Sequence, residues 1–378
     1  FKLSQFDNYK NTKIAIILIN YFGLVDNKKF LDKIYNNKNW ISIVDLVQSP
    51  FDFINFLLNK KFKVYNIDKL SIVSTPEKFK INPKNKNYKF FKLNLLNEKK
   101  LEKLIYLIKP NYIFNFAAES HVDRSIDKPK LFIQDNIISS LNLFNIFKEF
   151  SKKNKMWILF HISTDEVFGS NFGKPSKENS PYFPSSPYSS SKASTDLIAI
   201  SFIETYKTPI KILNLCNNFG PYQYLEKFIP TIVFNLINNK KVPVYGNGKN
   251  LREWIYINDS CRAIFSLIKY KGDIKRFNIG TNFRINNLNL TNKIFNILKQ
   301  KKLTKLTNKK YFKLVKDRPG HDLRYALNSK KFYDITKFRL NDSLNSGLIK
   351  TIDWYLENKS WTKYVKRKYV NKRIGIND

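Results

Sequence analysis

The stretch from residue 157 to residue 192 constrains the fold more than any other part of the chain. It opens with the apolar run Trp157–Phe160, which predicts a buried strand, and soon reaches Thr164, Asp165 and Glu166. In an open α/β sheet, ligands bind at the carboxyl ends of the strands. A hydroxyl group and two adjacent carboxylates at such a strand end therefore indicate an α/β sheet with a polar site at its edge.

A second group of polar residues follows on what the sequence predicts to be a helix. Ser186 suits the N-cap and Pro187 the first turn, so Tyr188 and Lys192 lie one turn apart on the same face. An ammonium group beside a phenol favours the phenolate, which can act as a general base. A Tyr-x-x-x-Lys spacing also arises by chance in a chain with 21 tyrosines and many lysines. The interpretation therefore depends on the strand before the pair and the capped helix around it.

Short apolar strands alternate with amphipathic helices, which predicts a Rossmann-like, doubly wound parallel sheet with a smaller α/β substrate-binding lobe. We expect residues 1–220 to form the cofactor-binding part, with 1–50 atypical, and residues 221–378 to form mainly the substrate-binding lobe and the C-terminal helix. The expected strands are Lys13–Ile19, Ile41–Val47, Lys63–Asp68, Tyr88–Leu95, Tyr112–Phe116 and Ile210–Leu215. The expected helices are Asn27–Tyr35, Phe53–Asn59, Leu101–Ile108, Leu131–Phe150, Pro187–Tyr206 and Leu344–Leu356.

The chain of 378 residues carries a formal net charge of +37, from 67 Lys and Arg against 30 Asp and Glu. Such an excess can mark a protein that binds nucleic acid or an anionic membrane. Here the lysines are spread along the whole chain and accompany many Asn, Ile, Phe and Tyr, all of which have A/T-rich codons. We therefore expect no specific nucleic-acid partner, and a surface that attracts anionic ligands.

Few residues suit a disulfide framework or a metal ion. Cys216 and Cys261 are too few for such a framework, and three widely separated histidines without metal-ligand spacing predict no metal site. The apolar run Ile14–Val25 includes Asn20 and is about half as long as a membrane span, so it predicts a buried strand. We expect a cytoplasmic protein without a membrane anchor.

Several short segments of the chain match one known pattern. They are Ala117–Ser125, Ser163–Val167, Ser186–Lys192, Asn217–Tyr222, Glu226–Lys227, Leu251–Trp254 and Arg318–Asp322. Together they resemble the dTDP-glucose 4,6-dehydratases, a family of the extended short-chain dehydrogenase/reductase superfamily. The resemblance runs from about Phe53 to about Lys363. It is specific, because related epimerases lack an Asp-Glu pair after the threonine.

The resemblance implies a lyase that converts dTDP-glucose to dTDP-4-dehydro-6-deoxyglucose, with tightly held NAD that is reduced and then reoxidised. In this family pattern Tyr188 takes the proton of the C4 hydroxyl, Glu166 removes the C5 proton, and Asp165 protonates the departing C6 hydroxyl. Thr164 hydrogen-bonds the C4 oxygen, while Lys192 tunes the tyrosine and holds the nicotinamide ribose. A homodimer and a place in dTDP-rhamnose biosynthesis are implied as well.

Further residues match family positions that bind the cofactor or the substrate. The resemblance also implies that residues 1–220 form the NAD-binding domain. Asp68 ends a predicted strand, where an acid hydrogen-bonds the adenosine ribose in dinucleotide folds. The other expected NAD contacts are Asn94, Leu95, Ala117, Ala118, Ser120, Asn136, Tyr188, Lys192 and Asn217. The expected substrate contacts are Ser120, His121, Thr164, Asn217, Lys227, Arg252, Asn287, Arg318 and His321. His121 can be a catalytic base, but a structural histidine beside the nucleotide loop is the favoured alternative.

The chain departs from the family pattern where a glycine-rich phosphate loop should stand. No glycine occurs between Gly23 and Gly169, and the family's glycines are replaced by Val47–Asp52. Glycines allow the turn that brings backbone amides to the pyrophosphate, and an acid there opposes that ligand. We therefore expect weak NAD binding and low activity.

Several alternatives remain open at this point. The chain can be a catalytically impaired remnant, its start can be misread, or Ser49 and backbone amides can form a rebuilt phosphate loop. A sister nucleotide-sugar epimerase or decarboxylase would keep the Tyr-Lys pair but has no use for the Asp-Glu pair.

Overall fold

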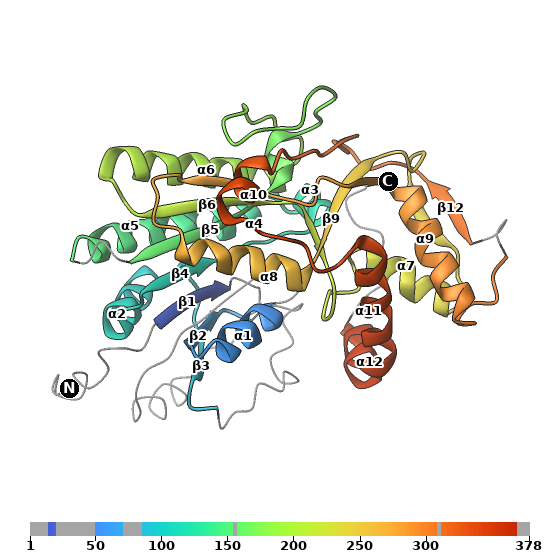
Figure 1. The fold of residues 1–378 in the computed structure, drawn as a ribbon, viewed down its shortest axis with the longest axis horizontal. Coiled ribbons are helices and arrows are strands. Elements are labelled where there is room, and N and C mark those ends of the chain that lie inside the picture. Colours follow the sequence, from blue (N-terminus) through green and yellow to red (C-terminus); the bar gives the residue numbers. More distant parts are fainter. Residues whose placement is uncertain (1–13, 20–49, 71–84, 154–156, 308–310, 369–378) are drawn as a thin grey trace.

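A seven-stranded parallel sheet forms the centre of the molecule (Figure 1). The computed structural model describes residues 14–19, 50–70, 85–153, 157–307 and 311–368. Strands β2 and β3 lie on one side of β1 and the later strands on the other, so the switch point, where such sheets bind ligands, lies at β1 and β4. In spatial order the strands are β10 (Arg276–Ile279), β6 (Ile210–Leu215), β5 (Ile158–Thr164), β4 (Tyr112–Asn115), β1 (Ile14–Ile19), β2 (Lys63–Asp68) and β3 (Tyr88–Lys92).

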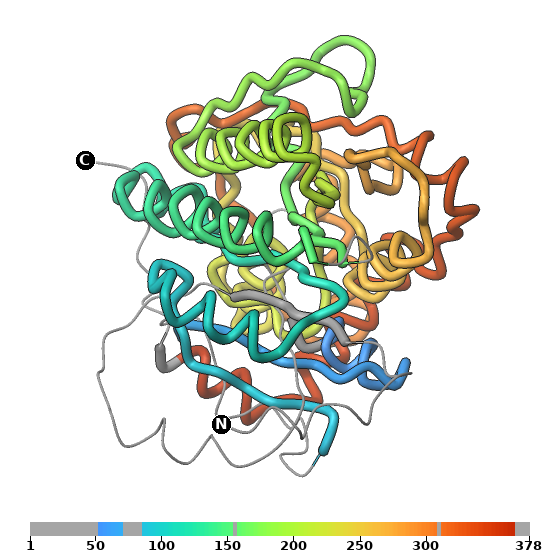
Figure 2. The backbone as a smooth tube through the Cα atoms, turned by 90° about the vertical axis from the view of Figure 1, so that its left-hand side faces the viewer, coloured from blue at the N-terminus to red at the C-terminus, as the bar shows by residue number. Residues whose placement is uncertain are grey.

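Helices cover both faces of this sheet (Figure 2). One layer consists of α2 (Glu98–Ile108), α5 (Ser139–Ser151) and α6 (Pro187–Tyr206), and the other of α1 (Pro50–Asn59) and α8 (Ile257–Ser266). Aromatic rings fill the space between strands and helices. Phe114 on β4 stacks on Phe160 of β5 at 4.8 Å between ring centroids, and Phe53 of α1 meets Phe114 edge-on at 5.1 Å. All three rings are fully buried, as the hydrophobic effect requires of a core.

The later part of the chain adds two small sheets and a group of helices. The three-stranded sheet has the order β11 (Arg284–Asn286), β9 (Leu251–Tyr256), β7 (Asn217–Phe219), and the two-stranded sheet pairs β12 (Phe312–Val315) with β8 (Val242–Tyr245). The helices are α7 (Phe228–Ile237), α9 (Asn287–Gln300), α10 (Lys330–Thr336), α11 (Leu344–Glu357) and α12 (Lys359–Lys368), with a 3-10 turn at Leu267–Lys269. Because β10 returns to the large sheet, the division of the chain near residue 221 stays a prediction.

Most of the expected elements in the described residues are confirmed. Strands β1, β2 and β6 match the predictions within a residue, and α6 begins and ends at the residues expected. Strand β3 is shorter than expected and ends at Lys92, because the chain turns soon after it. In that turn the side chain of Asn94 accepts a hydrogen bond from the backbone N–H of Leu96 at 3.0 Å. The segments expected at Asn27–Tyr35 and Ile41–Val47 lie outside the described residues.

The long helix expected at residues 131–150 is confirmed, but its path is not α-helical throughout. The helical path there consists of α4 (Pro129–Phe132), a π-helical turn at Ile133–Ile138, and α5. A π-helical turn is wider than an α-helical one, and such turns are common at functional sites. Here it carries Asp135 and Asn136, both buried. The preceding loop, which follows β4, leads into the short helix α3 (Val122–Asp127).

The connection between β1 and α1 consists of residues 20–49, which lie outside the described residues. In dinucleotide folds this first connection carries the phosphate loop. The prediction of a missing glycine loop therefore stays a prediction. Asp52, which is described, lies in the first turn of α1. Its charge contributes to raising the pKa values of Tyr222 and Cys261, after burial, so it acts on the side of α1 that packs against α8.

No helix in the described ranges is long and apolar enough to cross a membrane.

Candidate active site

The carboxyl end of β5 carries the acid pair singled out in the sequence. Thr164 ends the strand and caps a 3-10 turn at Asp165–Phe168, with its Oγ1 accepting from the backbone N–H of Glu166 at 3.2 Å. The same hydroxyl lies 3.2 Å from Asp165 Oδ1. Thr164 and Asp165 are buried, and Glu166 is half-buried. The tight turn thus holds two carboxylic acids side by side at the edge of the sheet.

Burial and nearby charges affect the pKa values of Asp165 and Glu166 differently. Burial raises the pKa of Asp165 well above its ordinary value, and the negative charges of Glu166 and Glu253 raise it further. Burial also raises the pKa of Glu166, but the positive charges of Arg318 and Arg252 counter this. Because the two acids interact, they titrate as a coupled pair. The arrangement favours a protonated Asp165 and makes Glu166 the better base.

Helix α6 brings the tyrosine and lysine to the same edge. Ser186 is the N-cap and forms a reciprocal capping box with Ser189, while Pro187 occupies the first turn. Tyr188 and Lys192 are both buried, and Lys192 Nζ donates to the backbone oxygen of residue 162 on β5 at 2.7 Å. The predicted spacing of the pair on one helix face is confirmed, and the ammonium group is tied to the strand that carries the acids.

Several residues expected to contact NAD line the carboxyl edges of neighbouring strands. Asp68 ends β2 and is buried, and its Oδ1 accepts from the backbone N–H of Leu70 at 2.8 Å. Ala117 and Ala118 follow β4 and are buried, where their small side chains allow close approach of a ligand. Leu95 is also buried. The side chains at these strand ends suit a dinucleotide, with an acid for ribose hydroxyls and small residues beside it.

The π-helical turn contributes a buried amide to the same region. Asn136 Oδ1 accepts from the backbone N–H of Glu119 at 2.6 Å, and its Nδ2 donates to the backbone oxygen of Glu119 at 2.9 Å. The same Nδ2 lies 2.8 Å from Ser191 Oγ on α6. Asn136 therefore joins the loop after β4 to the helix that carries the tyrosine. Asn217, at the start of β7, donates to the backbone oxygen of Glu253 at 3.3 Å.

The cationic residues expected to bind the nucleotide sugar are held by neighbouring protein groups. Lys227 Nζ donates to the backbone oxygen of Ser120 at 2.9 Å, and Arg318 Nη1 lies 3.1 Å from Asp123 Oδ1. Arg252 lies on β9 and is buried. Since the charges of Arg318 and Arg252 both act on the glutamate of the acid pair, the structure brings these cations and the acids into one site.

The remaining predicted residues have structural contacts of their own. His121 is the N-cap of α3, with its Nδ1 accepting from the backbone N–H of Arg124 at 3.3 Å, and burial lowers its pKa. This is what a structural histidine does, so a role as base stays a prediction. His321 Nδ1 lies 2.6 Å from Asp317 Oδ1, and burial lowers its pKa to about 4. Asn287 begins α9 and is buried.

Sequence reasoning missed Tyr325, whose hydroxyl lies 3.2 Å from Glu166 Oε2 and 2.9 Å from Asp322 Oδ2. The guanidinium carbon of Arg252 lies 4.0 Å from the centroid of its ring. Asp322 stands in a segment that carries the family resemblance but was given no role. The one sequence signal that could have singled out Tyr325 among the 21 tyrosines is its place three residues after Asp322.

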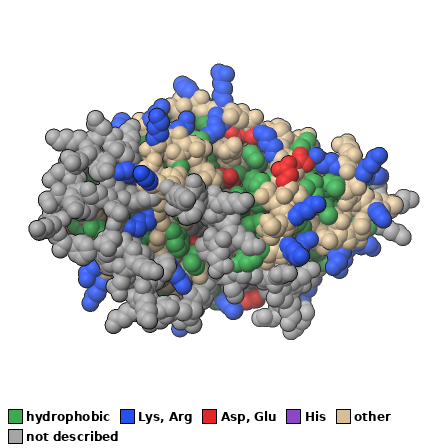
Figure 3. Space-filling model, turned by 90° about the horizontal axis from the view of Figure 1, so that it is seen from below, with side chains coloured by type: hydrophobic (Ala, Val, Ile, Leu, Met, Phe, Trp, Pro, Cys, Tyr) green, Lys and Arg blue, Asp and Glu red, His purple; other side chains and the backbone are tan. Residues whose placement is uncertain are grey.

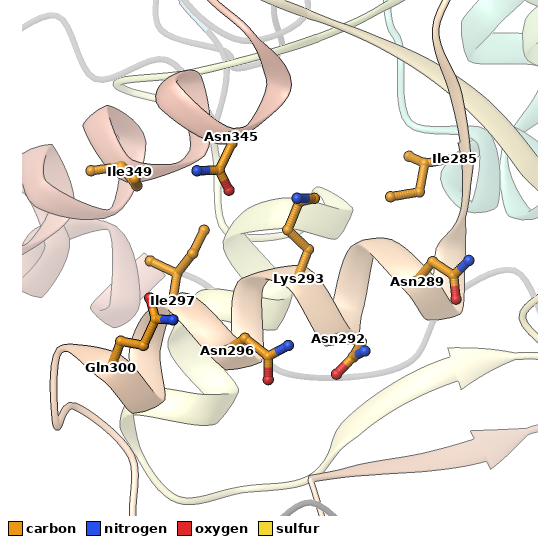
Figure 4. A pocket seen from close by; sticks show the side chains of 9 residues that line it. All are labelled: Ile285, Asn289, Asn292, Lys293, Asn296, Ile297, Gln300, Asn345 and Ile349. Atoms are coloured by element: carbon orange, nitrogen blue, oxygen red, sulfur yellow. The ribbon is translucent and has the colours of Figure 1, made fainter.

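A pocket of about 430 Å³ lies elsewhere, between α9 and α11 (Figure 4). Carboxamide side chains, one lysine and three isoleucines line it. None of these residues belongs to the predicted site. The lining residues are Ile285, Asn289, Asn292, Lys293, Asn296, Ile297, Gln300, Asn345 and Ile349. Within the described ranges no group of three or more His, Cys, Asp and Glu could hold a metal ion.

Comparison with known proteins shows which families have a similar sequence and a similar fold. The family model described as GDP-mannose 4,6 dehydratase matches residues 52–351. The chain is 33% identical over 330 residues to a protein of Sinorhizobium fredii named probable dTDP-glucose 4,6-dehydratase, with 85% of this chain and 94% of that protein covered. It is 35% identical over 339 residues to dTDP-glucose 4,6-dehydratase of Escherichia coli, with 84% and 93% covered. The crystal structure of dTDP-glucose 4,6-dehydratase from Bacillus anthracis in complex with NAD has a TM-score of 0.75 and 31% identity, covering 94% of this chain and 100% of that one.

Proposed function

This chain belongs to the family described by the GDP-mannose 4,6 dehydratase model, within the NAD-dependent epimerase/dehydratase superfamily, and we propose that it is a dTDP-glucose 4,6-dehydratase. The observation that carries the proposal is the Asp165–Glu166 pair, whose pKa values are both raised, at the strand end beside Tyr188 and Lys192. An elimination of water needs one acid and one base at adjacent carbons, and this pair supplies both. The named relatives support dTDP-glucose as the substrate.

The side chains divide the reaction among them. Tyr188 accepts the proton of the C4 hydroxyl, with Lys192 stabilising the phenolate. Once C4 is a ketone, the C5 hydrogen is acidic, and Glu166 removes it. Asp165 gives its proton to the C6 hydroxyl, which leaves as water while the C5–C6 double bond forms. Thr164 holds the C4 oxygen by a hydrogen bond during these steps.

NAD is the cofactor we propose for this site, and when bound it supplies a hydride acceptor and later the hydride donor. The residues that fit it are Asp68 for the adenosine ribose, Ala117 and Ala118 for close approach, and Tyr188 and Lys192 for the nicotinamide ribose. The support is their common position at the carboxyl edge of one parallel sheet. Relatives of similar fold have been crystallised with NAD.

Glu166→Gln tests the assignment of the base. This variant should still oxidise C4 but not eliminate water, so reduced nicotinamide should accumulate on the enzyme when dTDP-glucose is added. Its near-ultraviolet absorbance measures the accumulation. Glu204→Gln, at an exposed site on α6, is the matched control and should turn over normally. Normal turnover by Glu166→Gln would show that another residue is the base.

An impaired remnant of such an enzyme is a second candidate, because Gly23 is the last glycine before Gly169. Losing a few charge-assisted hydrogen bonds, each about 1.5–3 kcal/mol, would weaken NAD binding by orders of magnitude. On this alternative the protein purifies largely without NAD, and a Gly-x-x-Gly-x-x-Gly turn built between Val47 and Phe53 restores binding. Mass spectrometry of the purified protein decides, since a full complement of NAD contradicts the remnant.

A homodimer is part of the same proposal. The π-helical turn and α6 pack against each other and expose large apolar side chains on their outer surfaces. Ile133 is 44% exposed, Ile138 41% and Leu197 57%, and a second copy of the chain could cover these side chains. Sedimentation equilibrium would test this, and a monomer at micromolar concentration would contradict it.

A further inference from the structure

The Tyr325 hydroxyl group lies between Asp322 and Glu166, the proposed base. The Asp322 side chain is buried, and its carboxylate collects three hydroxyls. Ser170 Oγ donates to Oδ1 at 2.8 Å, while Ser185 Oγ and the Tyr325 hydroxyl both reach Oδ2, the latter at 2.9 Å. Ser170 and Ser185 lie near the two ends of the loop that joins the acid pair to α6. Asp322 therefore fastens that loop to a segment far away in the sequence.

The Tyr325 side chain has contacts both at its hydroxyl group and over its ring. Its hydroxyl lies 3.2 Å from Glu166 Oε2 as well as 2.9 Å from Asp322 Oδ2. The guanidinium group of Arg252 covers its ring, and the same group donates through Nη2 to the backbone oxygen of Asp322 at 2.8 Å. Asn250 Nδ2 donates to that oxygen too, at 3.1 Å. A turn of the phenol away from the carboxylates would break its two hydroxyl contacts and its packing against the Arg252 guanidinium group.

The number of protons decides how the three groups share their hydrogen bonds. A phenol has one proton to donate, and an ionised carboxylate can only accept. Tyr325 therefore cannot donate to Asp322 and to Glu166 at the same time. The phenol oxygen lies closer to Asp322 Oδ2, at 2.9 Å, than to Glu166 Oε2, at 3.2 Å, which places the phenol proton on the Asp322 side. Glu166 then faces a lone pair of the phenol oxygen.

On the basis of the proposed function, we propose that Asp322 is a positioning residue for the elimination, which acts on Glu166 through Tyr325. By holding the phenol proton, Asp322 turns the oxygen of Tyr325 into an acceptor for the proton that Glu166 takes from C5. The C5–H bond breaks and its electron pair forms the C5–C6 double bond as the C6–O bond breaks. Asp165 protonates the departing hydroxyl, which leaves as water, and the proton from C5 stays on Glu166. From there the same proton can be returned to C5.

Direct titration of the Glu166 carboxyl tests this without any turnover. The probe is ¹³C NMR of protein labelled at the glutamate carboxyls, with the Glu166 signal identified by its loss in Glu166→Gln. Tyr325→Phe should lower the titration midpoint by about one pH unit, because the protonated form loses its acceptor. If Tyr325 donates to Glu166 instead, the same variant raises the midpoint, and the proposal is overturned.

A double-mutant cycle tests whether Asp322 acts through the phenol. Asp322→Asn frees the phenol proton for Glu166 and removes a negative charge, so it should lower the midpoint too. On the Tyr325→Phe background the part of the shift that comes from the phenol proton should vanish and only the part that comes from the charge should remain, so the shift should be smaller there. An equal shift on both backgrounds, or no shift at all, overturns the proposal. Asp334→Asn, at an exposed site that pairs with Lys330, is the control and should leave the midpoint unchanged.

Kinetics separate this inference from the proposed function. If the wild-type protein dehydrates dTDP-glucose, Asp322→Asn should lower kcat with little change in KM and move the acidic limb of the kcat profile to lower pH. If the wild-type protein dehydrates no nucleotide sugar, the proposed function fails, while the titration still decides whether Asp322 sets the protonation of Glu166. Should Asp322→Asn fail to fold, the sign of the Tyr325→Phe shift alone decides.

Discussion

At the scale of single residues, Tyr188 is the side chain whose loss should have the clearest effect. Tyr188→Phe should lower kcat by a factor of about 100 to 10,000, the usual contribution of a general base. Binding of the nucleotide sugar should change little, because the ring and its packing against Phe132 remain. Stopped-flow kinetics and calorimetry measure the two quantities. Tyr206→Phe, at an exposed site on the same helix, is the matched control. Loss of binding would make Tyr188 a substrate contact and not the base.

Local spacing and capping made part of this site predictable. Ser186 and Pro187 gave the start of the helix, and a start at that position places Tyr188 and Lys192 on one face. The backbone partner of Lys192 on β5 was not predictable, because it depends on how the helix packs on the sheet. Contacts such as that between Tyr325 and the acid pair join residues far apart in the sequence, and no local rule brings them together.

At the scale of elements, the junction of β5 and α6 is tied by a buried polar network. His161 on β5 and Asp196 on α6 are 3.4 Å apart, and Asp196 also accepts from Ser163 at 2.7 Å and from Tyr182 at 2.9 Å. Burial and the charge of Lys192 lower the pKa of His161 to about 4. Burial alone would raise the pKa of Asp196, but its hydrogen bonds and nearby positive charge lower it overall.

This junction predicts acid sensitivity. The unfolded chain protonates His161 near its ordinary pKa of 6.5 and the folded chain only near 4, so the unfolded state binds more protons between these values. Its contribution to stability is complete above pH 6.5 and is lost as the pH falls towards 4. In urea unfolding, His161→Gln should reduce the slope of the unfolding free energy against pH in this window by at most about 1.4 kcal/mol per unit. An unchanged slope would contradict the buried, neutral histidine.

Element types were easier to predict than their internal geometry. Apolar runs identified β2 and β6, which bury almost every side chain, and the capping residues identified α6. The π-helical turn at Ile133–Ile138 was not predicted, because no local sequence rule separates a π-helical turn from an α-helical one. What distinguishes it is the tertiary role of Asn136, whose amide satisfies the backbone of the loop after β4. Hydrogen bonding between distant segments decides such local departures.

At the scale of the whole molecule, the net charge of +37 comes from lysines and arginines spread along the entire sequence. On the face in Figure 3, Lys and Arg side chains are scattered over the described surface with a few acids between them. We expect duplex DNA to bind weakly and without sequence preference, with an affinity that falls steeply as salt rises. Fluorescence anisotropy over a salt series measures this. Sequence-selective binding at physiological salt would contradict it and would point to a second function.

The position of β1 has a practical consequence for any shortened version of this protein. The family match begins at residue 52, so a boundary drawn from it would discard residues 14–19. That strand lies inside the sheet, because it pairs with β2 on one side and with β4 on the other. In a chain without β1, strands β2 and β4 would each have an edge of unpaired backbone N–H and C=O groups. Such exposed strand edges pair with strands of neighbouring molecules and promote aggregation. Strand β1, which precedes the part of the chain that matches the family model, thus joins β2 and β3 to the other four strands of the sheet.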